Sequence, residues 1–293
     1  MNDMLIRGLA GDGNVRFFAV DSTAILKKAV SLHHLSITNA VIMGRLMSAA
    51  LMMGLDLKND NDLITLIIEG DGPVGKVLVT AGNKGAVKGY INNPELETPY
   101  DEKENRFGVK QALGNGVIKI IKNIGLKTPY QGQVELKYGT IARDLTYYFS
   151  SSEQIPSSMG LGVLIGSRGE VVKSGGFLVQ LLPQTPEEVI SQLEKNLETF
   201  PNLTDVMDMG HTIAHIMTNF ILADLHVEIK DTMPAVYRCD CSREKFSRGL
   251  QLLGKKELTA ALQQEEKITV QCHFCNQLYE YSKNELEAIL EKL

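Results

Sequence analysis

The sequence of 293 residues lacks tryptophan altogether, and it contains only four cysteines and nine prolines. Aromatic residues make up 6% of it, which is too few to predict the stacking platforms that hold single-stranded nucleic acid. A basic tail is missing too, because the formal net charge is −5 and residues 231–293 carry nine Lys and Arg against ten Asp and Glu. These absences argue against nucleic acid as a partner.

Motifs for nucleotide binding and catalysis are also missing. Residues 70–75 match the pattern G-x-G-x-x-G, but strand-like residues 76–80 follow where a dinucleotide site needs the start of a helix. His211 and His215 have the spacing of the metalloprotease motif His-Glu-x-x-His, yet Thr212 stands in the place of the catalytic base. We interpret the two histidines as neighbours on one helix face, and we predict that the protein is not an enzyme.

One long apolar run is present, residues 36–55, and it has the length of a membrane span. Arg45 lies at its centre and Thr38, Asn39 and Ser48 interrupt it, which would be costly in lipid. We therefore expect a helix that is buried inside a globular domain, and no membrane partner. The chain opens without a basic segment or a cleavage-site pattern, so we expect a cytoplasmic protein and not a secreted one.

The order of the local signals divides the chain into three parts. Strand and turn patterns dominate residues 1–183 around the apolar run, which predicts an α+β, sheet-rich domain around a buried central helix. The sequence Thr185-Pro186-Glu187-Glu188 has an N-cap, a first-turn proline and a capping-box glutamate, and it begins a helical linker over residues 184–230. Residues 231–293 form a small C-terminal module that contains every cysteine.

The four cysteines form two close pairs, Cys239 with Cys241 and Cys272 with Cys275, separated by thirty residues. Each pair can supply two sulfurs from one tight turn, and folding of the spacer can bring the pairs together, as a tetrahedral four-thiolate zinc site requires. Because four thiolates complete the zinc shell, His273 is not expected to be a ligand. The sequence thus predicts one zinc ion per chain.

Two other interpretations of the cysteines stay open. Two structural disulfides would suit a secreted protein. A static zinc ribbon would only hold the C-terminus together, in an adaptor that binds a fixed partner through its N-terminal domain. One pair is Cys-x-Cys and the spacer exceeds the roughly fifteen to twenty residues common in ribbons, which disfavours a ribbon without excluding it.

The same four residues could also make folding depend on redox state. A module of about sixty residues has little core, and zinc binding contributes roughly 10–16 kcal/mol to the folding of small zinc peptides. Thiolates are the form that oxidants attack, and each of them has a neighbour with which to close a disulfide. Oxidation would then remove the ligands, unfold the module and expose apolar surface of the linker.

The sequence resembles the redox-regulated heat-shock chaperones of the thirty-three-kilodalton class, a family of bacterial holdases. At the C-terminus the resemblance rests on residues 237–246 (YRCDCSREKF) with Leu253-Gly254, and on residues 270–275 (VQCHFC) with Tyr279. The body carries further matching segments: residues 69–75 (EGDGPVG), 89–90 (GY), 93–94 (NP), 129–132 (PYQG), 144–149 (DLTYYF), 152–156 (SEQIP) and 175–177 (GGF).

This resemblance implies the same three-part fold and a function. Reduced, zinc-bound members are inactive, and hypochlorous acid, or peroxide under unfolding conditions, forms a disulfide within each pair, here Cys239–Cys241 and Cys272–Cys275. Zinc release and unfolding of the switch and linker then activate an ATP-independent holdase, often a homodimer. It binds unfolded client proteins until reduction, when they pass to ATP-dependent foldases. A static adaptor would instead lose its function together with its zinc.

Overall fold

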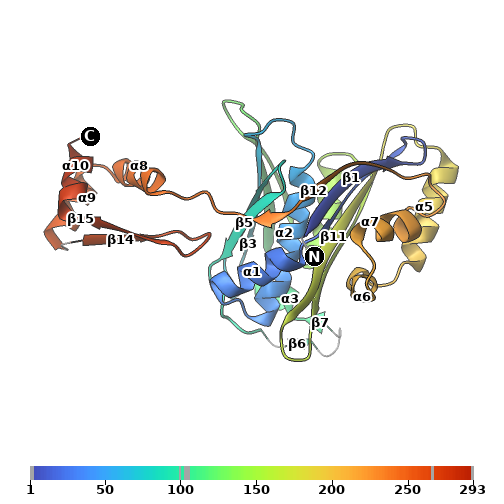
Figure 1. Cartoon of the computed structure of the whole chain (residues 1–293), viewed down its shortest axis with the longest axis horizontal. Coiled ribbons are helices and arrows are strands. Elements are labelled where there is room, and N and C mark those ends of the chain that lie inside the picture. The colour runs from blue at the N-terminus through green and yellow to red at the C-terminus, as the bar shows by residue number, and fades with distance from the viewer. Residues whose placement is uncertain (1–2, 99, 102–105, 265–266, 292–293) are drawn as a thin grey trace. The chain divides into compact units, whose positions relative to one another are not determined.

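The computed structural model describes residues 3–98, 100–101, 106–264 and 267–291. The chain forms two compact units, Met1–Arg238 and Cys239–Leu293. In the first unit two β-sheets enclose a helix, and the second unit combines short helices with one hairpin (Figure 1).

A five-stranded antiparallel sheet forms one layer of the first unit, in the order β10-β11-β2-β1-β12. Its side chains alternate between two cores: Leu5, Phe18 and Leu178 belong to one, and Ile6, Phe17 and Phe177 to the other. This alternation is the pattern of a sheet that is covered on both faces. The strands are β1 (Met4–Ala10), β2 (Val15–Asp21), β10 (Ser157–Ile165), β11 (Val171–Leu181) and β12 (Glu228–Pro234).

A six-stranded sheet forms the other layer, in the order β13-β5-β4-β3-β8-β9. All its neighbours are antiparallel except β13, which runs parallel to β5. The strands are β3 (Leu63–Gly70), β4 (Val77–Gly82), β5 (Ala86–Ile91), β8 (Gly116–Asn123), β9 (Tyr130–Glu135) and β13 (Val236–Tyr237); the short strands β6 (Tyr100–Asp101) and β7 (Arg106–Phe107) pair separately.

The G-x-G-x-x-G segment at residues 70–75 is a connection between two antiparallel strands. β3 ends at Gly70, β4 begins at Val77, and Ile68 pairs with Val77 across the turn. Because a strand follows the last glycine, no helix N-terminus faces the turn from this position. The prediction of a strand–turn–strand connection is confirmed.

Helix α2 (Ile37–Gly54) is the predicted buried central helix. It contacts β10 and β11 of one sheet and β4 and β5 of the other, and all but two of its residues are buried. The Ser36 side chain caps it by accepting the Asn39 N–H at 3.3 Å. Its length and composition would allow it to cross a membrane, but 89% of the stretch is buried inside the protein, as in the core helix of a soluble fold. The prediction of a buried helix within residues 36–55 is confirmed.

Shorter helices complete the α+β first unit. Helix α1 (Thr23–His33) leads into α2, α3 (Val109–Leu113) lies near β3, and α4 (Ala142–Ser151) packs on β9 and β10. The remaining face of the five-stranded sheet is covered by α5 (Glu187–Thr199), α6 (Leu203–Asp208), α7 (Ile213–Ile216) and the π-helical turn η1 (Met217–Ile221) (Figure 1). Helical structure in the predicted linker is thus present.

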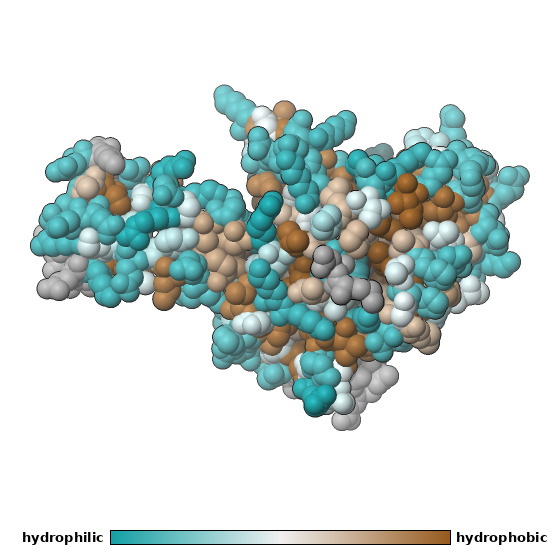
Figure 2. Space-filling model, viewed as in Figure 1, coloured by the Kyte–Doolittle hydropathy of each residue, from teal (hydrophilic) through white to brown (hydrophobic). Residues whose placement is uncertain are grey.

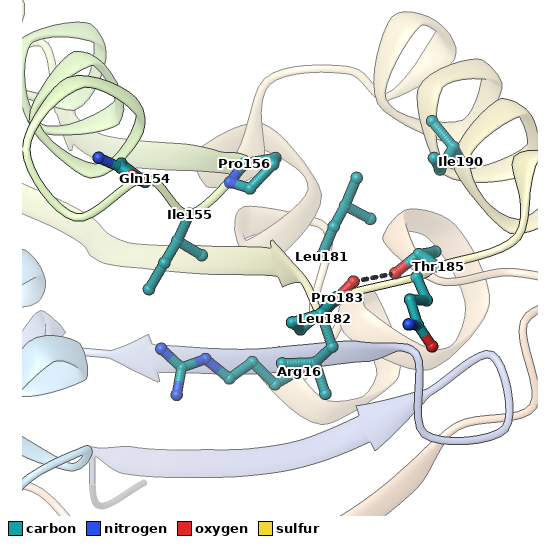
Figure 3. Close-up of a pocket in the computed structure, with 10 residues that line it drawn as sticks. Arg16, Gln154, Ile155, Pro156, Leu181, Leu182, Pro183, Thr185 and Ile190 are labelled. Carbon is teal, nitrogen blue, oxygen red and sulfur yellow. Dashed lines mark hydrogen bonds between the residues drawn. The ribbon is translucent and has the colours of Figure 1, made fainter.

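Two details of the helical segment were predicted wrongly. Thr185 does not cap α5, because its hydroxyl donates to the Leu182 carbonyl at 2.6 Å and the helix starts after Pro186 (Figure 3). His211 precedes α7, so it does not share a helix face with His215; their rings instead stack at 4.8 Å. Both errors arise because a local pattern does not specify where the chain turns between short helices.

The second unit is small. It contains α8 (Arg243–Leu253), α9 (Lys255–Gln264), the hairpin β14 (Lys267–Gln271) with β15 (Leu278–Ser282), and α10 (Lys283–Leu290). Ser282 and Glu285 form a capping box at the start of α10. Among the described residues its buried apolar core is a set of five side chains, Leu250, Leu258, Tyr281, Leu286 and Ile289. So small a core indicates that the unit needs a further source of stability.

Candidate metal centre

Two different backbone segments carry the cysteine pairs. Cys239 and Cys241 lie in the extended chain before α8, and Cys272 and Cys275 lie in the turn between β14 and β15. The Cys272 N–H donates to the Gln277 carbonyl at 2.9 Å, and the Asn276 N–H donates to the Cys272 carbonyl at 2.8 Å. Asn276 has a positive φ of 60°, which asparagine tolerates better than most residues. These bonds fix the turn that holds the second pair.

The fold brings all four predicted cysteines together. Their Sγ atoms lie within 4.8 Å of one another, and two of the separations across the pairs are 3.7 Å, between Cys239 and Cys272, and 3.5 Å, between Cys241 and Cys275. Sulfurs at the corners of a tetrahedron, each about 2.3 Å from a zinc ion, would be about 3.8 Å apart. The cluster therefore fits a metal that prefers four thiolates, and His273 is not among its described members.

The sulfurs differ in their surroundings. Cys272 is 3% exposed, and the other three are half-buried. Burial raises the pKa of the Cys239 thiol and that of the Cys275 thiol. Burial acts in the same direction on Cys241, but a hydrogen bond from Tyr279 and the adjacent sulfurs outweigh it, so the pKa of Cys241 is lowered. Cys241 is thus favoured over Cys239 and Cys275 as the first thiolate.

Tyr279 is the functional neighbour that sequence reasoning missed. Its hydroxyl donates to the Cys241 Sγ at 3.2 Å, and this bond is the main reason why the pKa of Tyr279 is raised. A tyrosine that keeps its proton remains a donor, and such donors orient a ligand and stabilise its negative charge. In the sequence Tyr279 follows the second pair by four residues and belongs to the segment that carries the resemblance, but neither feature identifies Cys241 as its partner.

An ion pair near the cluster connects the N-terminal turns of α8 and α10. The Arg243 guanidinium at the start of α8 lies 2.7 Å from a Glu285 carboxylate oxygen at the start of α10. The Ser282 backbone N–H donates to the same carboxylate at 2.9 Å, and this bond together with Arg243 lowers the pKa of Glu285 to about 2. The Tyr281 hydroxyl donates to the Arg243 carbonyl at 2.7 Å. These contacts connect the segments that carry the two cysteine pairs.

We expect Tyr279→Phe to weaken zinc binding by about tenfold, because removal of an outer hydrogen bond typically costs 10- to 100-fold in metal affinity. Competition with a chelating dye would measure the change. Tyr281→Phe is the matched control, since it removes a hydroxyl of the same unit that bonds to Arg243 and not to a sulfur. Equal losses in both variants would show that stability of the unit, and not the bond to Cys241, determines the affinity.

A cavity of about 600 Å³ lies in the first unit where β11 leads into α5 (Figure 3). Its lining is mainly apolar, with Ile155, Leu181 and Ile190, and Arg16 is the only charged residue among the described ones that line it. Arg16 donates to the Gln180 side chain and pairs with Asp56. A single paired arginine provides neither a nucleophile nor an acid–base pair. The described residues that line the cavity therefore include no group of side chains that could carry out catalysis.

Comparison with known proteins finds matches that extend over nearly the whole chain. The family model described as Hsp33 protein matches residues 3–282. The 33 kDa chaperonin of Agathobacter rectalis is 44% identical over 98% of this chain and 99% of its own, and that of Caldanaerobacter subterraneus subsp. tengcongensis is 40% identical over 100% and 99%. The crystal structure of the 33 kDa chaperonin from Thermotoga maritima has a TM-score of 0.91 and 36% identity, over 100% of this chain and 99% of that one.

The predicted resemblance is confirmed along the full length of the sequence, and the predicted α+β fold agrees with the Thermotoga maritima structure. Because the match spans both units, it includes the cysteine cluster as well as the sheets. The chain therefore belongs to the Hsp33 family, whose members are chaperones and not enzymes.

Proposed function

We propose that this chaperone is an ATP-independent holdase that is inactive when reduced and is activated by oxidation of its four cysteines. The observation that carries the proposal is the cluster of four Sγ atoms within 4.8 Å, in a unit with a very small apolar core. Such a unit is stable only while its sulfurs are held together. A chaperone of this family binds unfolded client proteins, and the cluster would decide when it does so.

In the reduced protein, Cys239, Cys241, Cys272 and Cys275 would hold one Zn²⁺ ion. A bound zinc ion would compensate the charge of the thiolates and stabilise the folded module; in small zinc peptides this contribution is roughly 10–16 kcal/mol. A set of four sulfurs favours zinc over metals that prefer oxygen ligands. The Tyr279 hydroxyl would keep the Cys241 thiolate oriented.

In the oxidised protein, the sulfurs would pair as Cys239–Cys241 and Cys272–Cys275. For each disulfide, two thiolates lose two electrons, and one molecule of hypochlorous acid takes up these electrons and one proton and is reduced to chloride and water. The proposal is supported by the short sequence separation within each pair, which lets a disulfide form after the module has begun to open. Sulfurs that share a disulfide no longer bind a metal, so the module loses its main source of stability.

Unfolding would then extend into the linker. We assign the core to residues 1–183, the linker to 184–230 and the switch module to 231–293. The linker helices cover a sheet face that includes Phe17, Phe177 and Val179, and their departure would expose it. Apolar residues already reach the surface of the first unit around α5 and α7 (Figure 2). Met209, which directly follows α6, is 77% exposed. An apolar surface of this kind binds unfolded chains.

The active form would be a homodimer in the cytoplasm, where thiols are kept reduced until oxidative stress. Client release would follow reduction of the disulfides. The alternative is a static zinc adaptor, whose function would disappear when its zinc is lost. The two proposals therefore differ in the sign of the response to an oxidant.

We expect hypochlorous acid to convert the reduced, zinc-loaded protein from a form that does not suppress aggregation into one that does. Light scattering of a heat-unfolded client would report suppression, and a chelating dye would report about one released zinc per chain. Addition of a reductant and zinc should reverse both signals. Equal suppression before and after oxidation, or suppression that is lost with zinc, would contradict the switch.

A further inference from the structure

The geometry points to a specific place for clients: an extended client segment replaces residues 228–238 and adds as a β-strand to the edges of β1 and β5. We call residues 228–238 the strap. The inference rests on the proposed function, because it requires that oxidation unfolds the linker and the switch module. It identifies the edges of two sheets, and not only an apolar face, as the surface that binds clients.

The strap crosses from one sheet to the other within the first unit. Its first part, β12, pairs antiparallel with β1, from Leu9 opposite Glu228 to Met4 opposite Pro234 (Figure 1). Its second part, β13, pairs parallel with β5, with Val236 opposite Ala86. The strap is therefore the outer strand of both sheets, at the edge formed by β1 and at the edge formed by β5.

Opposite edges of the strap bond to the two sheets. The Ala235 N–H donates to the Asp3 carbonyl at 3.0 Å, whereas the N–H groups of Val236 and Arg238 donate to the carbonyls of Gly85 and Val87 at 2.8 and 3.0 Å. Because alternate residues of an antiparallel strand face the same neighbour, the N–H groups of residues 233 and 231 also face β1, and that of residue 232 faces away.

The side chains of β12 contribute little to its attachment. Five of its seven residues are exposed, and its ion pair between Asp231 and Arg7, at 2.5 Å, leaves both side chains more than 40% exposed. Exposed ion pairs add little stability. A Cβ atom at Gly8 would lie 2.2 Å from the Glu228 carbonyl, so this part of β1 is shaped for the close approach of a main chain. Recognition through the main chain does not depend on sequence, as the binding of varied clients requires.

Unlike most side chains of β12, the side chain of Tyr237 is buried, and it occupies a slot in the first unit. Tyr237 is 5% exposed, and its hydroxyl donates to the Gly89 carbonyl at 3.0 Å and lies 3.1 Å from His33 Nε2. The Lys28 ammonium lies 6.0 Å from the centre of the Tyr237 ring. The slot fits an aromatic side chain, so the best client segment is an extended one with a tyrosine or phenylalanine near its C-terminal end.

The strap is also placed to respond to the switch. Tyr237 precedes Cys239 by two residues, and β12 begins seven residues after the last helical residue, Ile221. The strap comprises the last three residues of the assigned linker and the first eight of the assigned switch module. Once the rest of both segments unfolds, the strap is attached only through its own bonds. Once it leaves, β1 and β5 become open edges with a row of unpaired backbone groups, which is a template for another strand.

Hydrogen exchange on the full-length protein tests the inference. Oxidation should raise amide exchange about tenfold or more in β1 and β5, and an equimolar heat-unfolded client should restore most of the protection. The edge strand β9, which the strap does not touch, and the inner strand β3 serve as references. Slow exchange in β1 of the oxidised, client-free protein, or fast exchange that the client leaves unchanged, would overturn the inference. Protection that returns with protein concentration alone would assign the edges to a second copy and would also overturn it.

A peptide of residues 228–238 tests the main-chain contact directly. Added to the oxidised full-length protein, it should compete with the client. N-methylation at Met233, whose N–H faces β1, should weaken binding about tenfold or more, and the same change at Thr232 should have little effect. Equal effects of the two methyl groups, or a peptide that does not compete, would contradict strand addition.

The two levels of the proposal can be separated. If oxidation produces no suppression of aggregation, the proposed function fails whatever the exchange data show. If suppression appears while β1 and β5 remain unprotected in the client complex, the holdase stands and only the strand-addition site is wrong.

Discussion

Cys272→Ser is expected to abolish stoichiometric zinc binding and to unfold the C-terminal unit of the reduced protein. Cys272 is the most buried of the four cysteines, and its sulfur lies 3.7 Å from that of Cys239. A serine hydroxyl is a poor zinc ligand. Zinc binding contributes roughly 10–16 kcal/mol to the free energy of folding of small zinc peptides, and a core of five buried side chains is too small to compensate for its loss. Zinc content from a chelating dye and amide exchange in α8–α10 would measure both effects.

The control for this variant is His273→Ser, a change in the same turn at a residue outside the sulfur cluster. It should retain about one zinc per chain. If the switch operates as proposed, Cys272→Ser should also suppress client aggregation without an oxidant, whereas His273→Ser should still require one. Full zinc content in Cys272→Ser would contradict the site.

Asp144→Ala is expected to lower the free energy of unfolding of the first unit by about 4 kcal/mol, because it leaves several buried donors without an acceptor. The Asp144 carboxylate is fully buried and accepts backbone N–H groups from Tyr138 at 2.7 Å, Thr140 at 3.1 Å and Ile141 at 3.2 Å. Ile141 has a φ of 61°, which is rare for a β-branched residue. The carboxylate thus holds a strained loop at the start of α4.

Urea unfolding of the full-length protein, followed in the transition of the first unit, would measure this loss. Asp144→Asn keeps one acceptor oxygen in place and should lose about half as much stability. Asp205→Ala, at an exposed position on α6, should change it by less than about 0.5 kcal/mol. A loss below about 1 kcal/mol in Asp144→Ala would show that the loop finds other partners.

The features predicted correctly depend on short stretches of sequence. The apolar run at residues 36–55 has almost no polar face but carries Arg45 at its centre, which predicts a helix that is buried within a globular domain. The cysteine pairs are equally local, because the two members of each pair are at most three positions apart. A set of four thiols also favours a metal that prefers sulfur ligands, such as zinc.

The details that were predicted wrongly concern the segments that lead into α5 and α7. The segment at Thr185 contains every residue of a capping box. The Thr185 hydroxyl nevertheless donates to the Leu182 carbonyl and does not cap α5. His211 has helical spacing to His215, but the chain enters α7 only at Ile213. Local patterns compete with turn geometry in such segments, and the tertiary contacts decide between them.

The sequence alone determined the buried helix, the metal-type cysteine set and the membership of a chaperone family. Only the tertiary structure decided where β12 lies. Its residues are mostly polar and exposed and end in Pro234, so they have no strand signal, and its partner β1 lies more than two hundred positions earlier, as the bond between Arg7 and Asp231 shows. A strand held by backbone bonds to a distant partner leaves no periodicity in its own side chains. For the same reason the strap, the Tyr237 slot and the bond from Tyr279 to Cys241 become visible only in the folded chain.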